Sequence, residues 1–299
     1  MLKLIVQVLK KIIPRPLRTI VKRMFPELAV MQNIHGIWKR TDPPNWPLPE
    51  LAGKQGLEKY EYSLFSQNGE DGILRYLYSE IGFHSKFFVE FGFGVNENNS
   101  LRLMLKEGFA GIFIDSSEFH VNQFNKAAQS FGILNVMAIN KFLNLENLES
   151  TIIESKAPME IDLLSIDVDG NDYWFWERIR CLSPRIVVIE YNASLGPELA
   201  LSVPYDPSFD RLQKHESGFY CGASITALDR LGKHKGYALI GCDSSGVNAF
   251  FIRHDCLTKN LKVMSPQLAY RPNKRRLGLG YSLEDQYRII KDLPFINIG

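Results

Sequence analysis

Short apolar runs with a polar residue at or next to their end recur through the middle of the chain. They cover residues 87–91, 111–115, 133–139, 162–166 and 185–190. Segments with helical character lie between them, such as residues 101–107 and 145–154. Buried strands that alternate with helices are typical of a parallel sheet covered on both faces. The pattern therefore predicts an α/β fold of the Rossmann-like kind.

The polar residues that end these runs are the first candidates for a site. They are Glu90, Asp115, Asn140, Asp167 and Glu190. In an open parallel sheet the carboxyl ends of the strands line the ligand crevice, so we expect these five side chains to converge there. For any one of them, the alternative is an ordinary loop residue that follows a strand.

The first run leads into a turn that contains Gly92 and Gly94. Without a Cβ atom, these positions let a ligand approach the backbone closely. Asn96 or Glu97 stands where a dinucleotide fingerprint has its third glycine, which argues against a pyrophosphate held on a helix N-terminus. The turn favours a nucleoside ligand without phosphate, such as S-adenosylmethionine. Asp115 is placed to accept hydrogen bonds from a ribose diol.

The order and spacing of these motifs resemble class I S-adenosylmethionine-dependent methyltransferases, in particular bacterial FkbM-like enzymes of polysaccharide and natural-product clusters. The resemblance lies in residues 90–94, 115, 140, 164–172 and 188–192. The resemblance implies a mostly parallel seven-stranded sheet, closed by an antiparallel hairpin at residues 236–241 and 247–253. The cofactor-binding residues that it implies are Gln67, Glu90, Gly92, Gly94, Asn99, Asp115, Ser116, Asn140 and Asp167.

An acidic cluster follows the fourth and fifth runs. Adjacent strand ends lie about 5 Å apart, and oxygen ligands suit a hard divalent cation such as Mg²⁺. The layout is similar to that of metal-dependent O-methyltransferases, which implies Asp167, Glu190 and Asn192 as ligands. The alternative is that these acids contact the cofactor or the acceptor without a metal. Asp169, Glu190 and His215 are the candidates for removing the proton of the acceptor hydroxyl.

Charge is distributed unevenly along the 299 residues, although the net charge is only +2. Residues 1–23 hold seven basic residues and no acid, between apolar residues at helical spacing. This predicts a cationic amphipathic helix on an anionic membrane surface, with packing on the domain or on another subunit as the alternative. We divide the chain into this arm (1–37), a Pro-rich linker (38–59), the methyltransferase domain (60–258) and a C-terminal extension (259–299).

The expected function is methyl transfer from S-adenosylmethionine to a hydroxyl of a bacterial glycan or a lipid-linked sugar acceptor. Four cysteines without close spacing favour free thiols in the cytoplasm, with peripheral attachment to the inner face of the membrane through the arm. No basic face or aromatic stacking motif points to nucleic acid as a partner. The sequence leaves open whether the protein forms a homo-oligomer. The alternatives are a nicotinamide-dependent oxidoreductase and a non-catalytic membrane-associated partner that retains the fold.

Overall fold

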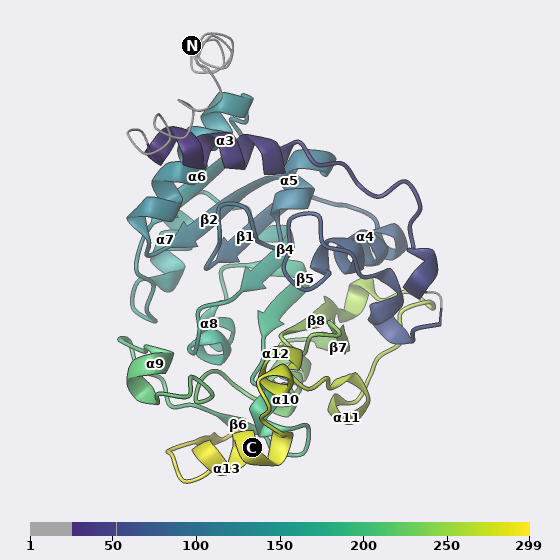
Figure 1. The fold of residues 1–299 in the computed structure, drawn as a ribbon, viewed down its shortest axis with the longest axis vertical. Coiled ribbons are helices and arrows are strands. Elements are labelled where there is room, and N and C mark those ends of the chain that lie inside the picture. Colours follow the sequence, from purple (N-terminus) through teal and green to yellow (C-terminus); the bar gives the residue numbers. More distant parts are fainter. Residues whose placement is uncertain (1–25, 52) are drawn as a thin grey trace.

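The computed structural model describes residues 26–51 and 53–299 (Figure 1). The basic arm predicted from residues 1–23 lies outside this part, so its membrane binding stays a prediction. Among the described residues, no helix combines the length and the apolar character needed to cross a bilayer. The cysteines Cys181, Cys221, Cys242 and Cys256 are free, as the sequence predicted.

Seven strands in the described part of the chain form one sheet, in the order β3-β2-β1-β4-β5-β8-β7. Their bounds are β1 Phe87–Phe91, β2 Ala110–Asp115, β3 Val136–Asn140, β4 Glu160–Ile166, β5 Ser183–Glu190, β7 Tyr237–Cys242 and β8 Asn248–Arg253. Neighbours from β3 to β5 pair in parallel, and β8 pairs antiparallel with β5 and β7. The predicted fold class is confirmed: a Rossmann-like, mostly parallel sheet closed by an antiparallel hairpin.

Helices cover both faces of this sheet because successive strand residues point to opposite sides. Phe88 belongs to one core cluster and Val89 to the other. The first face is covered by α3 (Pro26–Trp38), α4 (Glu70–Ile81), α5 (Leu101–Glu107) and α6 (Glu118–Phe131). The second face is covered by α7 (Leu148–Glu154), α8 (Asp172–Arg178) and α10 (Ile225–His234).

Local turns shift two of the predicted boundaries. The third strand begins at Val136 rather than at residue 133, because Gly132 ends α6 in a left-handed conformation and the N–H of Ile133 bonds back to the carbonyl of Ala128. Helix α7 begins at Leu148 rather than at residue 145, because the side chain of Asn144 accepts hydrogen bonds from the next residues and forms a turn.

The segments before and after the sheet domain pack onto it. Two short 3₁₀ helices, η1 (Pro49–Leu51) and η2 (Gly56–Tyr60), precede it, and η3 (Ala193–Leu195), β6 (Leu201–Ser202) and α9 (Arg211–Lys214) lie between β5 and α10. After β8 come η4 (His254–Cys256), α11 (Pro266–Ala269), α12 (Lys274–Gly278), α13 (Leu283–Ile290) and β9 (Ile296–Asn297), drawn in yellow-green to yellow in Figure 1. Strand β9 pairs antiparallel with β6, and Ile290 is fully buried against Leu195 and Val203. The C-terminal extension therefore covers the segment that follows β5.

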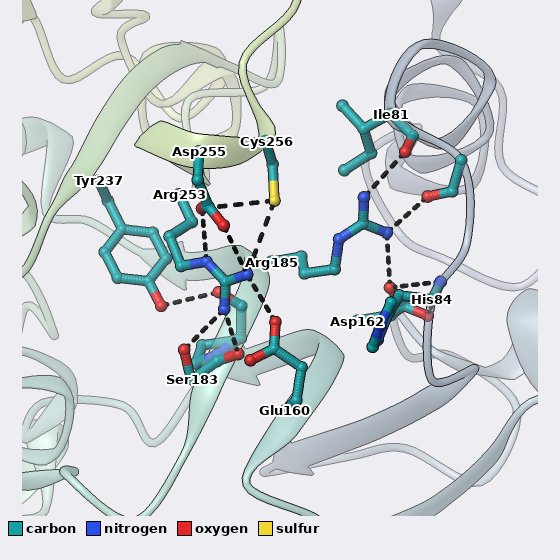
Figure 2. A network of polar contacts seen from close by, with 12 residues as sticks. Ile81, His84, Glu160, Asp162, Ser183, Arg185, Tyr237, Arg253, Asp255 and Cys256 are labelled. Atoms are coloured by element: carbon teal, nitrogen blue, oxygen red, sulfur yellow. Dashed lines mark hydrogen bonds and ion pairs between the residues drawn. The ribbon is translucent and has the colours of Figure 1, made fainter.

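The amino-terminal edge of the sheet is held by paired charges (Figure 2). Asp162 of β4 is fully buried, and its carboxylate accepts hydrogen bonds from the backbone of His84 and Lys86 and from Arg185, at 2.9 Å from Arg185 Nη1. Arg253, at the end of β8, lies 2.5 Å from Glu160 and also donates to Ser183. Each buried acid or guanidinium at this edge has an opposite charge or a hydrogen-bond partner.

Candidate functional site

A cavity of about 300 Å³ opens beside the turn that follows β1, at the carboxyl edge of the sheet. Six carboxylates line it: Glu70, Glu90, Glu97, Asp115, Asp167 and Asp169. No lysine or arginine is among the described residues of its wall. Carboxylates around a concave site create a negative potential that attracts cationic ligands and repels anionic ones.

The two glycines of the turn are required first by the protein itself. Gly92 has a left-handed φ of +69°, and a Cβ atom there would lie 1.8 Å from the carbonyl oxygen of Asp167. At Gly94 a Cβ atom would lie 2.8 Å from the carbonyl oxygen of Glu97. The sequence argument ascribed both glycines to ligand approach, whereas these distances show that close backbone packing already excludes a side chain. Both glycines nevertheless line the cavity.

Glu90 is buried at the end of β1 and shapes the cavity wall. Its carboxylate accepts hydrogen bonds from the backbone N–H groups of Asn99 and Ser100. Burial raises the pKa of Glu90 to about 7; the hydrogen bonds from Ser100 and Asn99 oppose this shift, and nearby Glu70 adds to it. Asn99 donates its amide to Ser165 on β4 and lines the cavity, as expected from the sequence.

Asp115, at the end of β2, is fixed by two backbone groups. One oxygen accepts from the N–H of Phe93 at 3.1 Å, and the other accepts from the N–H of Ser117 at 2.6 Å. These bonds hold the carboxylate at the cavity edge, and each oxygen keeps a further lone pair for a ligand. Asp115 thus occupies the position predicted for it.

Asn140 and Ser116, also predicted as cofactor contacts, are placed differently. The side chain of Asn140 donates to the backbone carbonyls of Asp115 and Ser116, so it supports the turn after β2. Within the described part of the chain, Asn140 lines neither the first cavity nor the two cavities that adjoin it. Ser116 lines a smaller adjoining cavity, and Ser117 reaches the first cavity instead.

Other cavity residues escaped the sequence argument. Asn248 of β8 donates to Glu70 at 2.7 Å, and Asn68 donates to the same carboxylate through its backbone and its side chain. Glu70 begins α4, and no local pattern indicates its place in the cavity, because its burial comes from segments far away in the chain. His120, on the first turn of α6, also lines the cavity, and only its place at a helix start after Asp115 could have indicated it.

A second cavity of about 690 Å³ adjoins the first. Both are lined by Gln67, Asn68, Asp167, Asp169 and Val247. Gln67 donates its amide to Glu97 at 3.2 Å, which ties the loop before α4 to the glycine turn. A ligand in the first cavity would therefore border directly on a second ligand.

Three carboxylates meet where the two cavities join. One oxygen each of Asp167, Asp169 and Glu190 lies within 4.8 Å of the others. Desolvation at the base of the cleft, then the charges of Glu190 and Asp169, raise the pKa of Asp167 well above its ordinary value, although part of its side chain remains exposed in the cavity. Burial, then Asp172 and Asp169, raise the pKa of Glu190 to about 7, although Arg211 and Arg276 oppose this. We call these three residues the acid trio.

The middle member of the acid trio sits on a strained backbone. Asp169 has a positive φ of 57°, which is uncommon for a residue with a side chain. The loop is held by Asp172, whose carboxylate accepts from the backbone N–H groups of Val168 and Gly170. Asp169 itself forms an ion pair of 2.5 Å with Arg211 of α9.

Two predicted residues do not join the acid trio. Asn192 is buried: its oxygen accepts from Ser194 and Arg276, and its amide donates to two backbone carbonyls. Its role as a metal ligand is therefore wrong for this arrangement, because its oxygen already has partners. His215 follows the short helix α9 and bonds Ser217 at 2.8 Å. His215 itself lines none of these three cavities, but its partner Ser217 lines the second, so its role as a base stays a prediction.

Comparisons with solved structures find distant similarity. Magnesium protoporphyrin IX methyltransferase from Synechocystis PCC 6803 is 15% identical, with a TM-score of 0.40 over 79% of this chain and 98% of that chain. The O-methyltransferase from Bacillus cereus is also 15% identical, with a TM-score of 0.42 over 78% and 95%. The [4+2]-cyclase SpnF is 14% identical, with a TM-score of 0.39 over 75% and 74%. No protein-family model and no curated protein matches the sequence. Similarity of this degree leaves the chemistry to be argued from the site.

Proposed function

We propose that this protein is an S-adenosylmethionine-dependent O-methyltransferase. The observation that carries the proposal is the cavity after β1, with six carboxylates and no lysine or arginine among its described lining residues. S-adenosylmethionine carries a sulfonium and an ammonium, so such a wall attracts it. A nicotinamide dinucleotide would bring an anionic pyrophosphate against the same carboxylates, which disfavours the oxidoreductase alternative.

Different residues bind the ribose and the methionine part of the cofactor. Asp115, at the end of β2, accepts hydrogen bonds from the ribose hydroxyls. Glu70 and Glu90 pair with the ammonium of the methionine part, and this charge lowers the raised pKa of Glu90 when the cofactor binds. Gln67 closes the same end through its bond to Glu97.

The acid trio supplies what the transfer itself requires. The acceptor oxygen attacks the methyl carbon, the carbon–sulfur bond breaks, and the hydroxyl proton must leave. Glu190 takes this proton, because a carboxylate with a pKa of about 7 is a stronger base than an ordinary one and is still ionised in part at neutral pH. Asp169 orients the acceptor together with its ion-pair partner Arg211.

The acid trio also fits a divalent cation, since three carboxylate oxygens within 4.8 Å match the oxygen ligands that Mg²⁺ takes. Asp167, Asp169 and Glu190 would hold it, and the ion would supply Lewis acidity to the acceptor oxygen. Turnover in excess chelator distinguishes an acid trio that holds a metal ion from one in which Glu190 acts without a metal. Loss of turnover with cofactor binding retained supports the metal, and full turnover assigns proton removal to Glu190 alone.

The cofactor assignment is tested by calorimetry with S-adenosylhomocysteine. Asp115→Ala should weaken binding by about 1–3 kcal/mol through the lost charge-assisted hydrogen bonds. Asp292→Ala, which removes an exposed carboxylate of the C-terminal extension, is the matched control and should bind as the wild type does. Equal affinities of the two variants would contradict the assignment, and so would tighter binding of NADH than of S-adenosylhomocysteine.

For the acceptor we propose a hydroxyl of a glycan or of a lipid-linked sugar, which follows from the sequence resemblance and from the size of the second cavity. A volume of about 690 Å³ is ample for a sugar beside the cofactor. The non-catalytic alternative requires side chains to fill the cleft after β1. The open cavity of about 300 Å³ there favours an active enzyme instead.

A further inference from the structure

The second cavity differs from the first because basic residues line it as well. They are Arg211 of α9 and Lys274, Arg275 and Arg276 of α12. Three of the four therefore come from the C-terminal extension, to which the proposed chemistry assigns no role. We call the three residues of α12 the basic wall.

Arg276 is the buried member of the basic wall, with only 7% of its surface exposed. Its Nη1 donates to the oxygen of Asn192 at 2.8 Å and to Ser194 at 2.6 Å, and Phe219 lies under the guanidinium at 5.1 Å. No carboxylate of the described residues lies within ion-pair distance of it, and its Nε has no partner among them. Its charge acts on Glu190 from beyond ion-pair distance, and a buried guanidinium whose hydrogen-bond partners are neutral can bind an anion directly.

The other two members of the basic wall are exposed. Lys274 donates to the hydroxyl of Ser244 at 2.7 Å, and Ser244 in turn donates to Glu61, so Lys274 meets an acid only through this hydroxyl and makes no direct ion pair among the described residues. Arg275 makes no side-chain hydrogen bond or ion pair within the described part of the chain. In contrast, Arg211 is already paired with Asp169. Three consecutive cations beside the acid trio thus make no direct ion pair within the described part of the chain, although Arg276 acts on Glu190 and Lys274 on Glu61 over a longer distance.

We infer that the second cavity binds the acceptor and that this acceptor carries a diphosphate near its reacting hydroxyl. This inference rests on the proposed function, since it takes the acid trio as the reacting end of the cavity. An arginine fork and a lysine are the side chains that bind phosphate oxygens best. A neutral sugar would leave the basic wall without an anionic partner, whereas an esterified diphosphate brings two negative charges and several acceptor oxygens to its three cations.

The test is calorimetry of the full chain with inorganic pyrophosphate at near-physiological salt. The double variant Lys274→Gln with Arg275→Gln should bind pyrophosphate roughly tenfold more weakly, because two charge-assisted contacts are lost. Lys262→Gln with Lys291→Gln removes the same charge from exposed positions of the extension outside the cavity and is the matched control. It should bind as the wild type does. Equal weakening of both doubles, or no binding by the wild type, would overturn the inference.

Arg276→Lys keeps the charge and loses the fork, and it should also weaken pyrophosphate binding while a thermal melt confirms that the variant is folded. Unchanged affinity in that folded variant would count against the inference. S-adenosylhomocysteine binding should be the same in all these variants. If the wild type binds pyrophosphate as expected but not S-adenosylhomocysteine, the proposed function fails and the anion site stands.

Two sources of the diphosphate can be separated with the same proteins. The probes are uridine diphosphate-glucose in solution and phosphatidylcholine vesicles that carry a polyprenyl diphosphate sugar. The probe that displaces pyrophosphate from the wild type, and does so more weakly from the α12 double variant, identifies the carrier. Displacement by neither probe would overturn a sugar diphosphate as the acceptor.

Discussion

The two edges of the central sheet use the same residue types in opposite ways. At the amino-terminal edge, Asp162 and Glu160 face Arg185 and Arg253 (Figure 2). At the carboxyl edge, Asp167 and Glu190 face each other, and both have raised pKa values. Paired charges stabilise the fold, whereas crowded like charges destabilise it and leave carboxylates with raised pKa values that can exchange protons. Charge pairing thus distinguishes the residues that stabilise the fold from those that we propose take part in methyl transfer.

The difference arises from what surrounds each carboxylate. Asp162 accepts from two backbone N–H groups and from a guanidinium, so its charge is compensated although it is fully buried. Asp167 has two acids of the trio beside it, and the one arginine that forms an ion pair there is taken by Asp169. A ligand cation, either the sulfonium or a divalent metal, would supply the missing compensation.

The largest expected effect is on turnover at the carboxyl edge. Glu190→Gln preserves shape and removes the base, so methyl transfer should fall by about 10²–10⁴-fold. The midpoint of urea unfolding should stay the same or rise, because a like charge has left the acid trio. Turnover and unfolding of the same preparation provide the measurement. Loss of stability together with activity would erase the distinction between the two edges.

The next largest effect is on stability at the amino edge. Asp162→Ala leaves the Arg185 charge without its partner, and the free energy of unfolding should fall by about 3–5 kcal/mol. Asp255→Ala removes the exposed partner of Arg253 and should cost less than about 1 kcal/mol. Urea titrations of both variants give these values. Turnover per folded molecule should be unchanged in both, and a drop with Asp162→Ala would couple the two edges.

The smallest expected effect is on pH dependence. Glu190 has an ordinary pKa of 4.5 and a pKa of about 7 in the folded protein, so the folded state binds the proton more tightly. Protonation of Glu190 therefore contributes to the free energy of unfolding. This contribution is fully present below about pH 4.5 and is lost as the pH rises through about 7. Melting temperatures should therefore decline over this window while turnover rises. Glu190→Gln should flatten the decline, and Asp255→Ala should leave it unaltered.

Local patterns predicted most of the fold and part of the site. Apolar runs predicted the strands because burial on both faces requires continuous apolar residues in a parallel sheet. Asp115, Asp167 and Glu190 were found because they end a strand or directly follow one, where parallel topology sets their position. Asn192 and His215 lie beyond the strand end, where the chain turns, so strand position no longer determines what the side chain contacts.

By itself the sequence determined the order of strands and helices, the glycine turn and the acids at the carboxyl edge, since these depend on neighbours within a few residues. Only the tertiary structure decided how these acids are surrounded. Asn248 reaches Glu70 across 178 positions of the chain, and Arg276 reaches Asn192 across 84. No local pattern encodes such contacts, because they exist only once the sheet and the extension have packed together. The same packing determines which charges are paired and which are left for a ligand.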